Sequence, residues 1–137
     1  MKKIILITIL GFLTHNVIAQ EIYAEYKFKK AKNGYGFMSE VHKNYYELDS
    51  LILYKNGTFY RNKIFRTRKK IFSELKGDWK IDNGILYLNI IMEKKRSTSE
   101  KWTEIQEKYR YRIKKRKLNP LSGYESYADR KLKLIGK

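Results

Sequence analysis

Residues 79–90, with the sequence Trp-Lys-Ile-Asp-Asn-Gly-Ile-Leu-Tyr-Leu-Asn-Ile, decide the fold of this chain. Asn83-Gly84 in their middle is a strong hairpin signal, because both residues tolerate the positive φ that a two-residue turn requires. Such a turn makes two cross-strand pairs, Ile81 with Leu86 and Trp79 with Leu88. The apolar side chains then share one face, which predicts two antiparallel strands with one buried side.

A second hairpin is predicted upstream, where residues 48–54 and 58–65 flank Lys55-Asn56-Gly57. A three-residue loop with Gly57 in the left-handed conformation sets Leu53 opposite Phe59, whereas a two-residue turn puts them on different faces. We favour the three-residue loop, since it keeps the apolar side chains together. Asn56-Gly57-Thr58 also matches a glycosylation acceptor, but the turn already accounts for these residues.

Alternation of apolar and polar residues continues along the chain and predicts short strands rather than helices. About eight such runs occur, near 21–30, 37–42, 48–55, 58–65, 71–81, 85–93, 103–114 and 130–135. The predicted fold class is all-β, an antiparallel barrel of about eight strands, with a β-sandwich as the alternative. Residues 97–107 and 71–75 also fit a short helix, and 119–129, with the only proline, are expected to form a loop.

The N-terminus has the features of a secretory signal peptide. Lys2 and Lys3 precede an apolar run of about ten residues, half of what a membrane-spanning helix needs, and small residues precede Gln20. We therefore expect residues 1–19 to be a cleaved signal rather than a membrane anchor, and 20–137 to be one secreted or periplasmic domain.

The composition excludes most catalytic chemistry. The chain has no cysteine, and beyond the signal it has one histidine, His42. Thiolate nucleophiles and multi-histidine metal sites are therefore absent, and no spacing of carboxylates or glycines indicates hydrolysis or phosphate binding. We expect a protein that is not an enzyme and has no metal or cofactor.

Three motifs follow one another between residues 51 and 91. They are Leu51-x-Leu53-x-x-Asn56-Gly57-Thr58-Phe59, Gly77-x-Trp79 and Asn83-Gly84-Ile85-Leu86-Tyr87-Leu88. In this order they resemble the small secreted lipocalin-like β-barrel proteins of bacteria. The resemblance implies a barrel and, more loosely, an internal cavity for a ligand.

The leading functional hypothesis is thus a binding module that holds a small apolar ligand inside the barrel. An eight-stranded barrel is wide enough either for its own side chains or for one small ligand. The candidate ligand-binding residues belong to the apolar face of the two hairpins: Phe59, Trp79, Ile81, Leu86 and Leu88.

The alternative hypothesis follows from charge: 31 Lys+Arg against 14 Asp+Glu give a net charge of +17, or +15 without the signal. On a strand, Lys108, Arg110, Arg112 and Lys114 project from one face over ~20 Å. This cationic ladder could bind an anionic polymer or a membrane surface, with Tyr109 and Tyr111 nearby to stack on bases or sugars. Lysine outnumbers arginine 23 to 8 and no specific nucleic-acid motif occurs, so a merely solvated basic surface is the competing interpretation.

Overall fold

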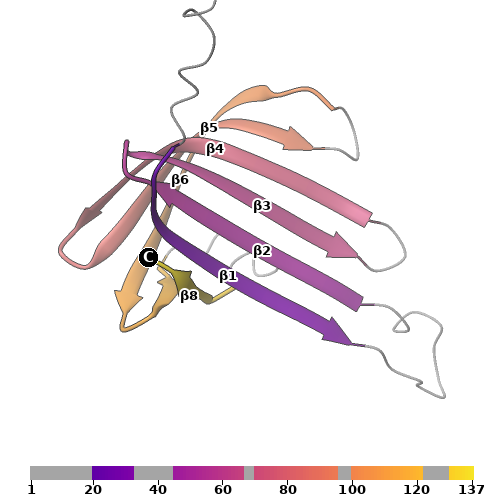
Figure 1. Ribbon diagram of the computed structural model, residues 1–137. Helices are drawn as coiled ribbons and strands as arrows, with labels where there is room; N and C mark the ends of the chain where they lie inside the picture. The colour runs from indigo at the N-terminus through magenta and orange to yellow at the C-terminus, as the bar shows by residue number, and fades with distance from the viewer. Residues whose placement is uncertain (1–19, 33–44, 67–69, 96–99, 122–129) are drawn as a thin grey trace, which may run out of the picture.

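The computed structural model of the protein describes residues 20–32, 45–66, 70–95, 100–121 and 130–137. These residues form a closed antiparallel barrel of eight strands, in which each strand pairs with the next and β8 pairs with β1 (Figure 1). The strands are β1 (Ile22–Lys32), β2 (Tyr45–Tyr54), β3 (Thr58–Arg66), β4 (Lys70–Asp82), β5 (Ile85–Lys95), β6 (Thr103–Lys114), β7 (Lys117–Pro120) and β8 (Leu132–Gly136). The predicted fold class is confirmed.

The two predicted hairpins have the predicted registers. Leu53 lies opposite Phe59 across a three-residue loop in which Gly57 has a φ of 85°. Around the second turn the pairs are Ile81 with Leu86 and Trp79 with Leu88. Asn83 and Gly84 have φ values of 47° and 72°, so both central residues adopt the conformation that a type I′ turn demands.

The eight strands differ from the predicted set in particular places. Residues 71–75 and 103–107, which also fitted a helix, belong to β4 and β6. β7 was missed because its proline indicated a loop, yet Pro120 ends the strand, where a missing N–H disturbs the ladder least. The predicted strand at 37–42, the predicted signal peptide and His42 lie outside the described residues.

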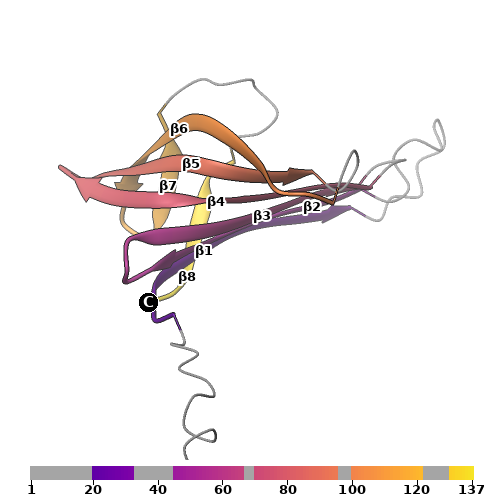
Figure 2. The same ribbon diagram turned by 90° about the horizontal axis from the view of Figure 1, so that it is seen from above.

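Short strands complete the barrel wall at the end where the tight turns lie. β7 has four residues and β8 has five, whereas β1 to β6 have nine to thirteen. β8 pairs with β1 only at Glu25–Lys27, and β7 pairs with β6 over Tyr111–Lys114. Figures 1 and 2 show β1 to β5 as a broad curved sheet, with β6, β7 and β8 completing the wall. We call the line where β8 joins β1 and β7 the closure seam.

The interior near the turn end is apolar and buried. Its buried side chains come from every strand and are Ala24, Tyr26, Leu51, Leu53, Phe59, Leu75, Leu86, Leu88, Ile90, Tyr111, Leu118 and Leu132. Burial of a side chain of this size stabilises the fold by about 1.5–3 kcal/mol. These residues are the core that positions the outer face described below.

A fully buried arginine borders this core. Arg61 on β3 donates from Nε and Nη2 to both carboxylate oxygens of Asp49 on β2, at 2.8 and 2.7 Å. Its Nη1 donates to the hydroxyl of Tyr111 on β6, at 2.7 Å. Burial disfavours the charged guanidinium, but attraction and hydrogen bonding to Asp49 and Tyr111 together more than offset this and hold the pKa of Arg61 above its usual value. The barrel interior therefore carries a permanent ion pair.

A second ion pair lies toward the other end of β2. Arg130 donates from Nε to Oε1 of the buried Glu47 at 3.0 Å and from Nη2 to Oε2 at 3.3 Å. The Tyr45 hydroxyl donates to the same carboxylate. Hydrogen bonding to Glu47 raises the pKa of Arg130. Both buried acids of β2 are thus matched by arginines, as buried charges require.

Candidate functional site

The outer side of β6 carries the predicted cationic ladder. Lys108, Arg110, Arg112 and Lys114 are all exposed. They alternate with half-buried Tyr109 and Ile113 and with fully buried Tyr111, so the strand presents cations outward and ring or aliphatic groups inward. The ladder is a real surface feature of the barrel.

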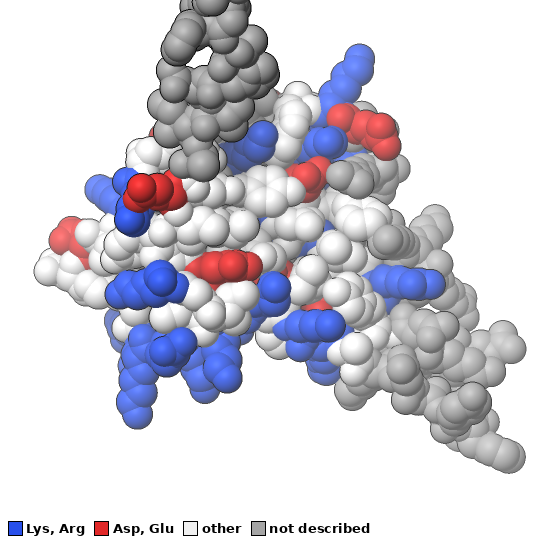
Figure 3. All heavy atoms as spheres, in the orientation of Figure 1, with Lys and Arg blue, Asp and Glu red and all other residues white. Residues whose placement is uncertain are grey.

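The basic surface extends from β6 onto the two short strands. A hollow of about 730 Å³ is lined by six cations and one amide side chain: Lys114, Lys115, Arg116, Lys117, Asn119, Lys131 and Lys133. We call the ladder together with these cations the basic face; it comprises Lys108, Arg110, Arg112, Lys114, Lys115, Arg116, Lys117, Lys131 and Lys133. Figure 3 shows Lys and Arg side chains gathered over the region where Figure 1 places β8 and the turn after β6.

Four lysines lie directly opposite one another across four neighbouring strands. Lys27 on β1 pairs with Lys133 on β8, which pairs with Lys117 on β7, which pairs with Lys114 on β6. Neighbouring strands are ~4.8 Å apart, so this lysine row extends ~14 Å across the closure seam. Like charges directly opposite one another destabilise a sheet, and an anion bound on the row removes that repulsion.

The cations of the basic face lack acidic partners among the described residues. The salt bridges seen among the described residues involve other cations. They join Lys27 to Glu25, Lys55 to Glu21, Arg61 to Asp49, Lys94 to Glu74, Lys95 to Glu93 and Arg130 to Glu47. Within that part of the chain, acids therefore neutralise cations elsewhere and leave the basic face uncompensated. A surface of this kind attracts anions from a distance.

The two tyrosines expected to stack beside the ladder do not face it. Tyr111 is fully buried and binds Arg61, and Tyr109 is half-buried with its ring centroid 5.7 Å from the guanidinium carbon of Arg61. The expectation that both rings meet a bound base or sugar is wrong for Tyr111, because adjacent residues of a strand point to opposite faces. The outward aromatic residue next to the ladder is Tyr87 on β5, which lies opposite Arg110.

The five candidate residues for an apolar ligand occupy different environments. Phe59, Leu86 and Leu88 are buried in the core, with exposures of 2%, 0% and 1%. Trp79 is half-buried, its Nε1 donates to the Tyr54 carbonyl at 2.9 Å, and its ring lies 4.8 Å from that of Tyr23. Ile81 is exposed. All five lie on the inward face of the two hairpins, but three belong to the buried core and two, Trp79 and Ile81, are more exposed.

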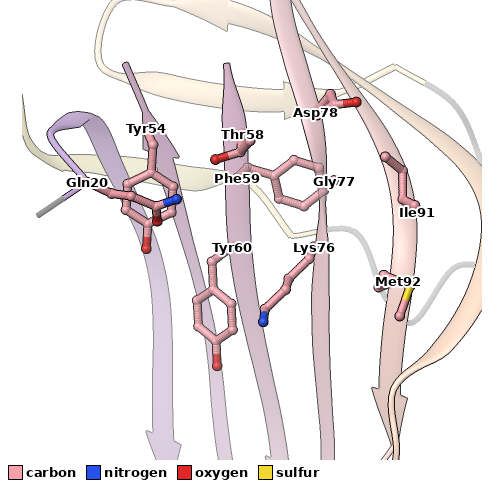
Figure 4. A pocket seen from close by; sticks show the side chains of 10 residues that line it. All are labelled: Gln20, Tyr54, Thr58, Phe59, Tyr60, Lys76, Gly77, Asp78, Ile91 and Met92. Atoms are coloured by element: carbon pink, nitrogen blue, oxygen red, sulfur yellow. The ribbon is translucent and has the colours of Figure 1, made fainter. Parts of the chain in front are cut away.

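Another hollow, of about 630 Å³, lies against β2 to β5 (Figure 4). In Figure 4 the Tyr60 and Lys76 side chains run alongside each other from paired positions of β3 and β4. The Lys76 ammonium lies 4.2 Å from the Trp102 ring centroid. The hollow also contains Asp78, so its lining is balanced in charge and shows no preference for an anion.

The described residues include no metal site. Among them, no group of three His, Cys, Asp or Glu side chains could hold a metal ion. No helix in that part of the chain is long and apolar enough to span a membrane. No family model, curated protein or solved structure matches the chain. The exposed cations of the basic face, which have no ion pair to a described acid, make this face the candidate site.

Proposed function

We propose that the protein binds an anionic polymer through the basic face. The observation that carries the proposal is the grouping of nine exposed cations, which lie on β6, β7 and β8, in the turn between β6 and β7 and just before β8, with no ion pair to a described acid. Keeping these like charges close together costs free energy in the unbound protein. A polyanion offsets that cost and releases its own counterions when it binds.

The spacing of the cations fits a ligand with repeated charges. Successive outward residues of the ladder are ~6.7 Å apart along β6, and the lysine row adds cations at right angles to it. Arg110 and Arg112 present planar guanidinium groups that bind phosphate, sulfate or carboxylate with two parallel hydrogen bonds. A single small anion could occupy only a fraction of this surface.

A polymer is a better ligand for this surface than a lipid bilayer. The outward residues of β6 from Glu104 to Lys114 are all polar or charged, so this strand has no apolar side chain to insert between lipid headgroups. Peripheral membrane binding usually combines basic charge with buried apolar area. The outward side of β6 supplies the basic charge but not the apolar area.

Binding of end-labelled polyphosphate, followed by fluorescence anisotropy at several salt concentrations, tests the proposal. We expect affinity to fall steeply as salt rises. Replacing Lys108, Arg110, Arg112 and Lys114 by Gln should weaken binding about tenfold or more and flatten the salt dependence. Circular dichroism confirms that the variant is folded.

A matched control removes the same charge elsewhere, through the replacement by Gln of Lys29, Lys55, Arg66 and Lys95, which are exposed residues outside the basic face. This control should bind nearly as the parent protein does. Equal losses in the two variants mean that only net charge matters and contradict the proposal. Tighter binding to vesicles of anionic lipid than to polyphosphate contradicts it as well.

A further inference from the structure

The outer surface beside the ladder contains a hollow whose lining includes the aromatic side chain of Tyr87. It has a volume of about 650 Å³ and lies over β4, β5 and β6. Its outward side chains are Asp78, Lys80, Tyr87, Asn89, Lys108 and Arg110. Two of them, Lys108 and Arg110, also belong to the ladder, so the hollow and the basic face are continuous.

Tyr87 lies among cations in this hollow. It is opposite Arg110 on β6 and opposite Lys80 on β4, and the Lys80 ammonium is 5.4 Å from its ring centroid. Lys108 follows on the same side of β6, opposite Asn89. An aromatic ring beside a row of cations is the arrangement that holds single-stranded nucleic acids, where the ring stacks a base and the cations bind the backbone.

From this arrangement we propose that the anionic polymer is a single-stranded nucleic acid, one of whose bases stacks on Tyr87 while neighbouring phosphates bind Lys108 and Arg110. The inference rests on the proposed function of the basic face. The ~6.7 Å step of the ladder is comparable to the separation of successive phosphates in an extended single strand. Duplexes do not fit, because their bases are stacked inside the helix.

Asp78 distinguishes a base from the rings of an acidic glycan. Its carboxylate lines the same hollow as Tyr87 and repels the sulfate or carboxylate groups of such rings. A nucleobase is uncharged, and its N–H groups, which are the ring N3–H in thymine and amino groups in the other DNA bases, can donate hydrogen bonds to Asp78 or to the Asn89 amide. The hollow thus suits an uncharged ring flanked by charged linkages, which is the chemistry of a nucleotide chain.

The experiment compares a labelled oligothymidylate with an abasic oligonucleotide of equal length, which has the same phosphates and no bases. We expect the parent protein to bind the oligothymidylate about tenfold more tightly. Tyr87→Ala should weaken oligothymidylate binding by about tenfold, which is within the effect of losing one stacked base. It should leave abasic binding unchanged, and Tyr87→Phe should keep the preference.

Tyr46→Ala is the matched control, since Tyr46 on β2 is also half-buried and has a lysine, Lys29, 6.0 Å from its ring centroid, but lies away from the basic face. It should bind both chains as the parent does. Equal binding of the two chains, an equal effect of Tyr87→Ala on both, or equally tight binding of duplex DNA overturns the inference and leaves the proposed function standing. Failure to bind polyphosphate, the abasic chain and the oligothymidylate alike overturns both.

Discussion

Arg61 on β3 donates a hydrogen bond across the barrel interior to the hydroxyl of Tyr111 on β6, at 2.7 Å. Tyr111 is the residue between Arg110 and Arg112 in the sequence. Its side chain points inward, whereas these two cations of the ladder point outward from the same strand. The buried contact therefore fixes the strand that carries the outer charges. Asp49 neutralises Arg61 through two further hydrogen bonds, so the interior position of β6 depends on three side chains from three strands.

Breaking the buried ion pair should destabilise the protein strongly. Asp49→Asn leaves the buried Arg61 without a counter-charge, and we expect a loss of about 3–5 kcal/mol in the free energy of unfolding. Tyr111→Phe removes one hydrogen bond and should cost about 1–3 kcal/mol. Urea unfolding followed by circular dichroism measures both. A loss below about 1 kcal/mol for Asp49→Asn is inconsistent with a buried, uncompensated arginine.

Gly77 is required by a close approach of two strands. A Cβ at this position would lie 1.9 Å from the backbone oxygen of Asn89 and 3.0 Å from the Phe59 ring. Gly77→Ala should therefore force β4 and β5 apart and lower the free energy of unfolding by about 1–3 kcal/mol or more. Gly136→Ala is the control, because its nearest contact is 4.0 Å away. Similar thermal stabilities of the two variants refute the steric explanation.

Alkaline pH should weaken the fold through Tyr26. Burial raises the pKa of this tyrosine above its ordinary value of 10.0, so the folded protein holds the phenolic proton more tightly than the unfolded chain does. This contribution is fully present below pH 10, decreases as pH rises from there and is lost above the folded pKa. For one proton the free energy of unfolding decreases by at most about 1.4 kcal/mol per pH unit. Tyr26→Phe should show a shallower alkaline decrease in urea unfolding, and an unchanged slope refutes this assignment.

Neutralising the lysine row should stabilise the unbound protein. Lys117→Gln and Lys133→Gln each remove a cation that directly faces another cation, and each should raise the free energy of unfolding by about 0.2–1 kcal/mol at low salt. High salt should abolish the gain, because it screens exposed charges. The same variants should bind polyphosphate more weakly. Lys55→Gln, which removes a partner of Glu21, should give no stabilisation; a gain equal to that of the row variants argues against cross-strand repulsion.

Much of the fold could be predicted because the information is local. Asn83-Gly84 and Gly57 set both hairpin registers through their own backbone preferences, and alternation then assigned Leu53, Phe59, Leu86 and Leu88 to the interior. The same alternation, continued four residues back from Leu53 and two residues on from Phe59, places Asp49 and Arg61 inside as well. Their opposite charges were the available signal of a buried pair, although charged residues are seldom found in a core.

The candidate site could be predicted only in part, because much of it depends on contacts between different strands. Alternation within β6 revealed the ladder, since it involves one strand. The lysine row depends on the pairing of β6, β7, β8 and β1. A two-residue turn, in which Lys115 has a φ of 53°, joins β6 to β7, but no turn encodes the register between β8 and β1, which are far apart in the sequence. The same limit applied to Tyr87, which becomes a neighbour of the ladder only once β5 pairs with β6.

The closure seam has a consequence for the order of folding. β1 to β7 can assemble from strands that are neighbours in the sequence, whereas the pairing of β8 with β1 joins distant parts of the chain and bears the largest entropy of loop closure. This last contact also brings Lys27 and Lys133 together. A polyanion on the lysine row would hold the seam shut, so its first effect on the protein would be a slower rate of barrel opening.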